Sequence, residues 1–192
     1  LVACYVATVF ILAGSSTVSW TTALPHVSAA GLLGLAVLAL QELPTRALKE
    51  ILVHWRIRHR LPGARAFTHY AQRDDRIDIS ELQKLVDPLP QAPREQNAVW
   101  YRWLKETEDA VEVSDTHRRY LILRDAAVTS LLLAVSSAGL MLLPGWAFSS
   151  TLLLFGLFLA AYLLLALSAR SVAARLVTTV IATKLRRLSV RA

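Results

Sequence analysis

The sequence predicts an all-α integral membrane protein with four transmembrane helices, arranged as two hairpins around a small helical cytoplasmic domain. Of the 192 residues, 55% are hydrophobic, yet the formal net charge is +7. Lys, Arg, Asp and Glu are absent from 1–41 and again from 126–169. A soluble domain places charged residues along its whole surface, so the two uncharged stretches indicate membrane spans.

Each uncharged stretch is long enough for two helices of about 20 residues joined by a turn. The first span is expected over 1–22, as a retained helix rather than a cleaved signal, because no positive region precedes its apolar centre. The second is expected over 27–43 and is closed by Pro44. The third and fourth are expected over 126–143 and 147–168.

These spans divide the chain into four parts. We expect a first transmembrane hairpin at 1–43, a cytoplasmic helical domain at 44–120, a second hairpin at 121–169 and a basic cytoplasmic tail at 170–192.

The distribution of Lys and Arg predicts the orientation of the spans. The turns near Pro25 and Pro144 carry no Lys or Arg. The other ends of the spans are flanked by basic residues, among them Arg46, Lys49, Arg118, Arg119, Arg124, Arg170 and Arg175. Since basic flanks stay in the cytoplasm, we expect a multi-pass inner-membrane protein with both termini cytoplasmic.

A basic amphipathic helix is expected over 45–60, immediately after the second span. Leu48, Ile51, Leu52 and Trp55 fall at helical spacing and would form its apolar face. On the polar side, Lys49, Arg56, Arg58 and Arg60 would contact the anionic headgroups of the bilayer. Basic clusters also bind nucleic acid, but a positive flank beside a span explains these residues without it, so no nucleic-acid partner is expected.

The rest of the middle segment predicts short helices. The run DISELQKLV fits a helix with Ser80 and Gln83 spaced as a capping box. A second helix is expected over 94–109, and Ser114 could cap a third that continues into the third span. This is a thin core for a domain by itself. We therefore expect the domain to be stabilised by the membrane surface, by another protomer of a homo-oligomer or by a cytosolic partner.

The aromatic stripe of the run REQNAVWYRW is expected to form the core of the small domain. The same run is the first place to expect a contact with a partner or a small ligand, because it concentrates amide, guanidinium and aromatic groups. The candidate contact residues are Arg94, Gln96, Asn97, Trp100, Tyr101, Arg102 and Trp103.

Nothing in the sequence predicts catalysis, a metal site or a cofactor. His54 and His59 would lie about 140° apart on a helix and could not face one metal ion. The chain contains none of the common hydrolase, metalloprotease or phosphate-loop motifs. The polar loop with His69, Asp74 and Asp75 is expected to hold solvated charges.

Two further patterns concern how the spans pack. Small residues recur four apart, which lets helices approach closely, either within one chain or between subunits. They are Ala30 and Gly34, Ala134 and Ala138, and Gly156 and Ala160. At the mouth of the third span, Arg124 is expected to reach the headgroups. Asp125 is expected to pair with Arg46 or Arg170 and so to tie the two hairpins together.

In layout alone, the chain resembles small four-span prokaryotic membrane proteins, including pore-forming effectors of antiphage systems. That resemblance implies a cytoplasmic module that senses a signal and a membrane part that responds. We therefore expect a non-enzymatic, oligomeric inner-membrane protein that transmits a partner or signal to its spans and acts as a pore-forming or membrane-disrupting effector. The alternative is a membrane anchor or accessory subunit that recruits a cytosolic partner without conducting ions.

Overall fold

The computed structural model describes residues 39, 42–140 and 148–189. Their regular secondary structure is helical, with no strand among them, which confirms the all-α class. The first expected span, nearly all of the second, the Ala30 and Gly34 pair and the turn at Pro144 lie outside the described residues.

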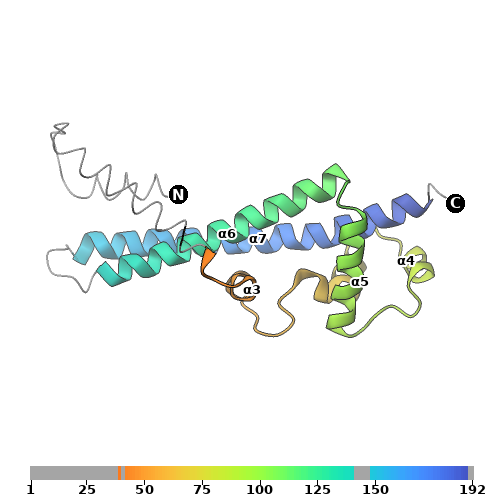
Figure 1. Ribbon diagram of the computed structural model, residues 1–192, viewed down its shortest axis with the longest axis horizontal. Coiled ribbons are helices and arrows are strands. Elements are labelled where there is room, and N and C mark those ends of the chain that lie inside the picture. Colours follow the sequence, from red (N-terminus) through yellow and green to blue (C-terminus); the bar gives the residue numbers. More distant parts are fainter. Residues whose placement is uncertain (1–38, 40–41, 141–147, 190–192) are drawn as a thin grey trace. The chain divides into compact units, whose positions relative to one another are not determined.

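The helices are few, and two of them are much longer than the rest (Figure 1). The shorter helices come first along the described chain, and the two long helices follow them. They are α3 (Arg46–His54), the short helices η1 (Pro62–Arg65), η2 (Ala66–Tyr70) and η3 (Ala71–Arg73), α4 (Ile79–Leu85), α5 (Pro93–Glu106), α6 (Val111–Leu140) and α7 (Phe148–Ser189).

Two helices are long and apolar enough to cross a membrane: Val111–Gly139 within α6, and α7. They correspond to the expected third and fourth spans. Hydroxyl side chains in the apolar part of α6 bond to carbonyl oxygens of their own helix: Thr129 to Asp125 at 2.8 Å, and Ser137 to Leu133 at 2.8 Å. Such bonding satisfies a hydroxyl where no water is present.

The chain divides into two compact units. Of the described residues, unit 1 comprises 39, 42–49, 125–140 and 148–165, and unit 2 comprises 50–124 and 166–189. The core of unit 1 joins α6 and α7 through Leu133, Ala134, Leu154 and Phe158. Leucines of α7 in the same unit are largely exposed, among them Leu153, Leu157 and Leu164.

The core of unit 2 draws on α5, the short η helices and the far parts of α6 and α7. Phe67 meets the edge of the Trp103 ring at 5.3 Å between centroids. Helix α7 continues to Ser189, through the segment expected as a basic tail. Its residues Leu176, Val177 and Ile181 are buried in this core. This part of the chain therefore contributes buried side chains to the core of unit 2.

Three helix boundaries differ from those expected. Helix α3 ends at His54, because Trp55 takes a left-handed backbone conformation with φ 52°, so the segment to residue 60 does not continue it. Asp78, rather than Ser80, caps α4 by accepting from the backbone N–H of Ser80 and Glu81. Helix α6 begins at Val111, one turn earlier than a cap at Ser114 would place it.

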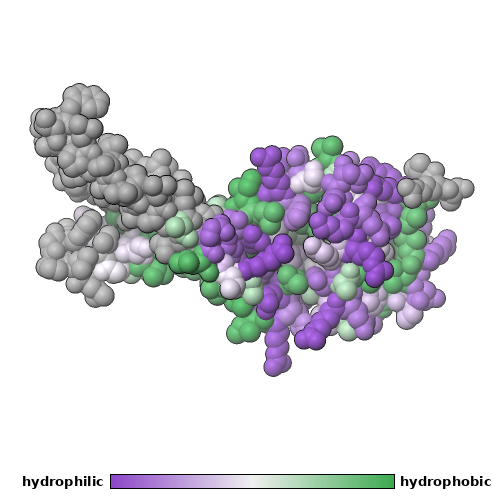
Figure 2. Space-filling view, viewed as in Figure 1, coloured by the Kyte–Doolittle hydropathy of each residue, from purple (hydrophilic) through white to green (hydrophobic). Residues whose placement is uncertain are grey.

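Basic residues near the end of α7 pair with the acidic turn between α5 and α6. Lys184 Nζ lies 2.6 Å from Glu106 Oε2, and Arg187 Nη2 lies 2.9 Å from both oxygens of Asp109. These hydrogen bonds from Arg187 lower the pKa of Asp109. The surface over α4 and α5 is largely hydrophilic in this view (Figure 2).

Candidate functional site

A buried network of polar side chains joins α3 to α6 in unit 2. Arg124 Nη1 lies 3.2 Å from Glu50 Oε1, and the hydroxyl of Tyr120 donates to Glu50 Oε2. Glu50 and Arg124 are only 3% and 8% exposed. His54 Nε2 completes the group, 3.2 Å from the Tyr120 hydroxyl and 3.5 Å from Glu50 Oε2. The sequence predicted that Arg124 reaches the lipid headgroups, whereas the structure places it inside the protein with a carboxylate.

The environment of Glu50 favours its charged form. Burial alone raises the pKa of this carboxyl, but the hydrogen bonds with His54 and Tyr120 and the nearby charge of Arg124 outweigh burial, so that the pKa is lowered. A carboxylate that stays ionised at neutral pH is suited to holding helices together and unsuited to donating a proton. The network therefore stabilises the packing of α3 against α6.

A second ion pair joins the same two helices in unit 1. Lys49 Nζ lies 3.5 Å from Asp125 Oδ1, and Lys49 is buried. The sequence suggested Arg46 or Arg170 as the partner of Asp125 and assigned Lys49 to the lipid headgroups. The structure places the Lys49 ammonium beside Asp125, and the pairing with Arg46 or Arg170 stays a prediction. Helix α3 thus offers a lysine and a glutamate, side by side in sequence, to an aspartate and an arginine that are also adjacent.

Arg170 of α7 holds the carboxyl end of α3. Its Nε donates to the carbonyl oxygen of Val53 at 2.9 Å, and its Nη2 donates to that of His54. The guanidinium carbon also lies 3.8 Å from the centre of the Trp55 ring. A cation is favourable at a helix carboxyl end, where the last carbonyl groups lack partners within the helix. Arg170 therefore fixes where α3 stops, with a cation–π contact in addition.

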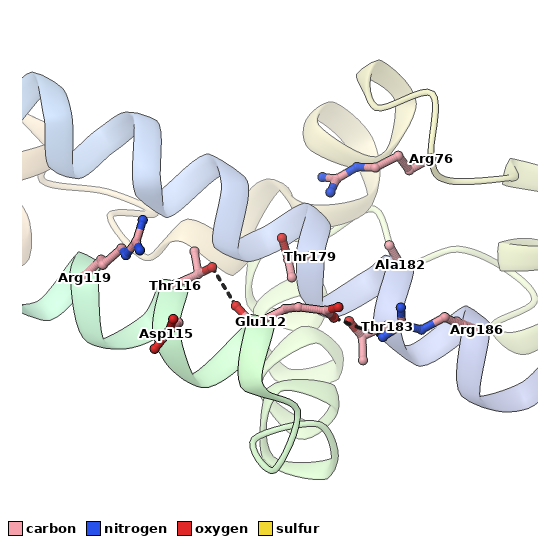
Figure 3. A pocket seen from close by; sticks show the side chains of 9 residues that line it. All are labelled: Arg76, Glu112, Asp115, Thr116, Arg119, Thr179, Ala182, Thr183 and Arg186. Carbon is pink, nitrogen blue, oxygen red and sulfur yellow. Dashed lines mark hydrogen bonds and ion pairs between the residues drawn. The ribbon is translucent and has the colours of Figure 1, made fainter.

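A polar groove runs between α6 and α7 in unit 2, with a cavity of about 560 Å³. Figure 3 shows the side chains that line it; they are Glu112, Asp115, Thr116 and Arg119 of α6, Thr179, Ala182, Thr183 and Arg186 of α7, and Arg76. Several of its charges are already paired: Arg186 Nη2 lies 3.0 Å from Glu112 Oε2, and Arg76 is bound to Asp74. The groove therefore carries both signs of charge, and its lining does not select a ligand of one sign.

A second cavity, of about 480 Å³, has basic walls. It brings together two groups of residues that the sequence analysis treated separately: Arg58 and Arg60 from the segment after α3, and Arg94 and Asn97 from the first turns of α5. His59 also lines it. Arg56 is exposed but is not part of this lining.

The other candidate contact residues of α5 serve the core or the surface. Trp100 and Trp103 are buried in the hydrophobic core of unit 2. Gln96 is 1% exposed, and its Oε1 accepts from the backbone N–H groups of Phe67 and Thr68 at 3.1 and 3.3 Å. Tyr101 and Arg102 are exposed on the outer face of the helix.

The small residues in the spans fall into two groups. Ala134 is buried between α6 and α7, and Ala138 is half-buried. Gly156 and Ala160 are exposed, and a Cβ added at Gly156 would meet nothing within 4 Å. The first pair packs within the chain. The second pair lies on an exposed face of α7, where the small side chains leave a shallow surface.

Sequence reasoning missed Glu50, Tyr120 and His54. One signal was present: Glu50 is the only acid in α3, and Tyr120 and Arg124 are four residues apart on one helix face.

Among the residues described, no three His, Cys, Asp or Glu side chains are grouped so that they could hold a metal ion. No protein-family model, curated protein or solved structure matches this chain.

Proposed function

We propose that this chain is a non-enzymatic, oligomeric inner-membrane protein that senses a signal on its cytoplasmic side and transmits it into its spans. The signal would be a protein partner or a small molecule that binds unit 2. The observation that carries this proposal is the continuity of α6 and α7. Each is one unbroken helix that supplies core residues to both units: Tyr120 and Ala134 in α6, Phe158 and Val177 in α7. A displacement of either helix in unit 2 must move its apolar part.

The membrane placement is supported by the exposed stripe of α7. Leu153, Leu157 and Leu164 are exposed along the helix, and the same stripe continues through Ser168, Ser171 and Arg175. An apolar stripe that turns polar within one helix turn fits the edge of the hydrocarbon region. On this basis we propose four spans, cytoplasmic termini and contact of the basic segment after α3 with anionic headgroups.

For the outcome of signalling we propose a pore or a loss of membrane integrity, as in prokaryotic antiphage defence. Support comes from the layout resemblance and from the shallow face at Gly156 and Ala160, where a second copy could pack closely. A gene that neighbours this one and encodes a binding partner would identify the signal.

Ion flux tests the proposal directly. The purified protein is reconstituted in liposomes that contain a self-quenched dye and hold a potassium gradient across their membrane. When oligomers form, the dye should leak out and the potassium gradient should collapse. Expression in bacteria should likewise depolarise the inner membrane, measured with a voltage-sensitive dye. Tight liposomes and an unchanged potential in cells that contain the assembled protein would contradict a pore.

Transmission along α6 can be tested at Ile122, an exposed residue of unit 2. Ile122→Pro breaks α6 within unit 2, just before its boundary with unit 1, because proline removes a backbone hydrogen bond and clashes with the preceding turn. We expect it to abolish depolarisation while the protein still reaches the membrane, and Ile122→Ala to retain it. Equal activity of both variants would contradict transmission through this helix.

The alternative is a membrane anchor or accessory subunit that recruits a cytosolic partner. One observation favours it: Thr129, Ser130 and Ser137 of α6 are buried and bond to carbonyl groups of their own helix, so these hydroxyls do not line a path for ions. An anchor predicts that the protein retains a cytosolic partner at the membrane without leakage.

A further inference from the structure

The basic cavity beside α5 carries an excess of positive charge. Arg58, Arg60 and Arg94 line it together with His59 and Asn97, and no carboxylate is part of its wall. The residues come from segments more than thirty positions apart, so the fold, rather than sequence proximity alone, gathers them. His59 takes φ 52°, a conformation uncommon for a residue other than glycine, in the turn that forms this wall.

Some arginines of unit 2 have acidic partners, and the arginines of this cavity do not. Arg76, Arg186 and Arg187 each lie within 3.0 Å of a carboxylate. For Arg58, Arg60 and Arg94 the described part of the chain provides no hydrogen bond or ion pair. Like charges gathered at one cavity repel one another, and a shared anion relieves that repulsion.

We propose that this cavity binds a phosphate-bearing anion. Guanidinium groups match phosphate oxygens with paired N–H donors, and three of them can surround one phosphate group. The Asn97 amide adds a donor from the same helix. A volume of about 480 Å³ falls within the range of small-ligand sites.

The lining of the cavity also includes exposed apolar side chains. Ile57 is 79% exposed and Leu61 is 42% exposed, and both line the same cavity. Exposed apolar side chains beside a phosphate site suit a ligand with a non-polar part attached to its phosphate. An anionic lipid and a soluble phosphate compound share this chemistry. A signalling role of the ligand rests on the proposed function, but its binding does not, because binding is measured without ion flux.

The test compares two triple variants that remove the same charge. Arg58→Gln, Arg60→Gln and Arg94→Gln empty the cavity of guanidinium groups. Arg65→Gln, Arg102→Gln and Arg118→Gln remove three exposed arginines from outside its lining and serve as the control. The full chain is reconstituted in phosphatidylcholine nanodiscs, and pyrophosphate binding is measured by calorimetry. In parallel, native mass spectrometry measures how much phosphatidylglycerol, against phosphatidylcholine, stays bound in detergent.

We expect the cavity variant to lose about tenfold or more in affinity for the probe that the wild type binds, and the control to stay within about twofold. Pyrophosphate binding identifies a soluble ligand, and selective retention of phosphatidylglycerol identifies a lipid. The melting temperature of each variant confirms folding, and Arg94→Gln alone should give a smaller loss in the same direction. The inference is overturned when the wild type binds neither probe, or when both triple variants lose affinity equally.

Discussion

Glu50 and Arg124 form an ion pair inside unit 2, with 3.2 Å between Oε1 and Nη1 and both side chains almost fully buried. Two charges removed from water are stable only when they are close and their remaining hydrogen-bonding groups are satisfied. Here the Tyr120 hydroxyl satisfies the second carboxylate oxygen. The pair fixes α3 against α6 directly before the uncharged part of α6.

Removing one partner should destabilise unit 2 strongly. We expect Glu50→Ala to cost about 3–5 kcal/mol, because Arg124 is left buried without its carboxylate. The measurement is thermal unfolding of the full chain in detergent, followed by tryptophan fluorescence. The double variant Glu50→Leu with Arg124→Met should recover much of the loss, because it buries no charge.

The exposed pair of Lys105 and Glu108 is the matched control, with 2.9 Å between its charged atoms. We expect Glu108→Ala to cost less than about 1 kcal/mol, since water solvates either charge alone. A comparable loss from Glu50→Ala and Glu108→Ala would show that the buried pair has no special role.

Asp125 should matter more for stability and assembly than its exposed neighbour Arg119. Asp125→Ala leaves the buried Lys49 without the carboxylate 3.5 Å away, which should cost about 1–3 kcal/mol. For Arg119, the described residues show no ion pair, so Arg119→Ala should cost less than about 0.5 kcal/mol. Unfolding in detergent and subunit number by size exclusion with light scattering give the comparison. Adding Lys49→Met to Asp125→Ala should restore stability, and equal effects of the two single changes would contradict this role.

The sequence predicted the helical class and the second pair of apolar helices, because an uncharged stretch and its length are local properties. It could not predict which charges would meet. Whether Arg124 reaches a headgroup or Glu50 depends on how α3 packs against α6, and helical spacing within one segment does not reveal that. The end of α3 was misplaced for a similar reason: Trp55 has no turn signal of its own, and Arg170, more than a hundred residues away, holds that end.

The same limit applies to α5. Its aromatic stripe suggested both a ligand contact and a core, and burial places Trp100 and Trp103 in the core. Arg94 and Asn97 line a cavity only because residues after α3 fold against the start of α5. The last helix shows the converse. The segment after the fourth apolar run was expected only as a basic tail, yet its helical spacing contributes an apolar face to the core of unit 2.

Gln96 should behave as a structural residue. It accepts from two backbone N–H groups of η2, and its Nε2 donates to the carbonyl oxygen of Gln91 at 2.9 Å. Gln96→Leu keeps the size of the side chain but leaves these buried groups without partners, so we expect a loss of about 1–3 kcal/mol. Thermal unfolding measures it, and Gln83→Leu on the exposed face of α4 is the control. A loss of ligand binding at unchanged stability would show instead that Gln96 contacts a ligand.

The link between Asp74 and Arg76 should make unit 2 sensitive to acid. Hydrogen bonds from Arg76 hold the pKa of Asp74 well below its usual value of 3.8, and Arg76 also donates to the Thr178 hydroxyl of α7 at 3.0 Å. A carboxyl whose pKa is lowered on folding stabilises the protein fully above its unfolded pKa, and this contribution is lost as the pH falls below that value. The wild-type melting temperature should therefore fall more steeply between about pH 5 and pH 3 than that of Asp74→Asn. Asp75→Asn, which removes the adjacent exposed charge, should keep the wild-type slope. Parallel profiles for the wild type and Asp74→Asn would mean that this ion pair does not contribute to the acid sensitivity.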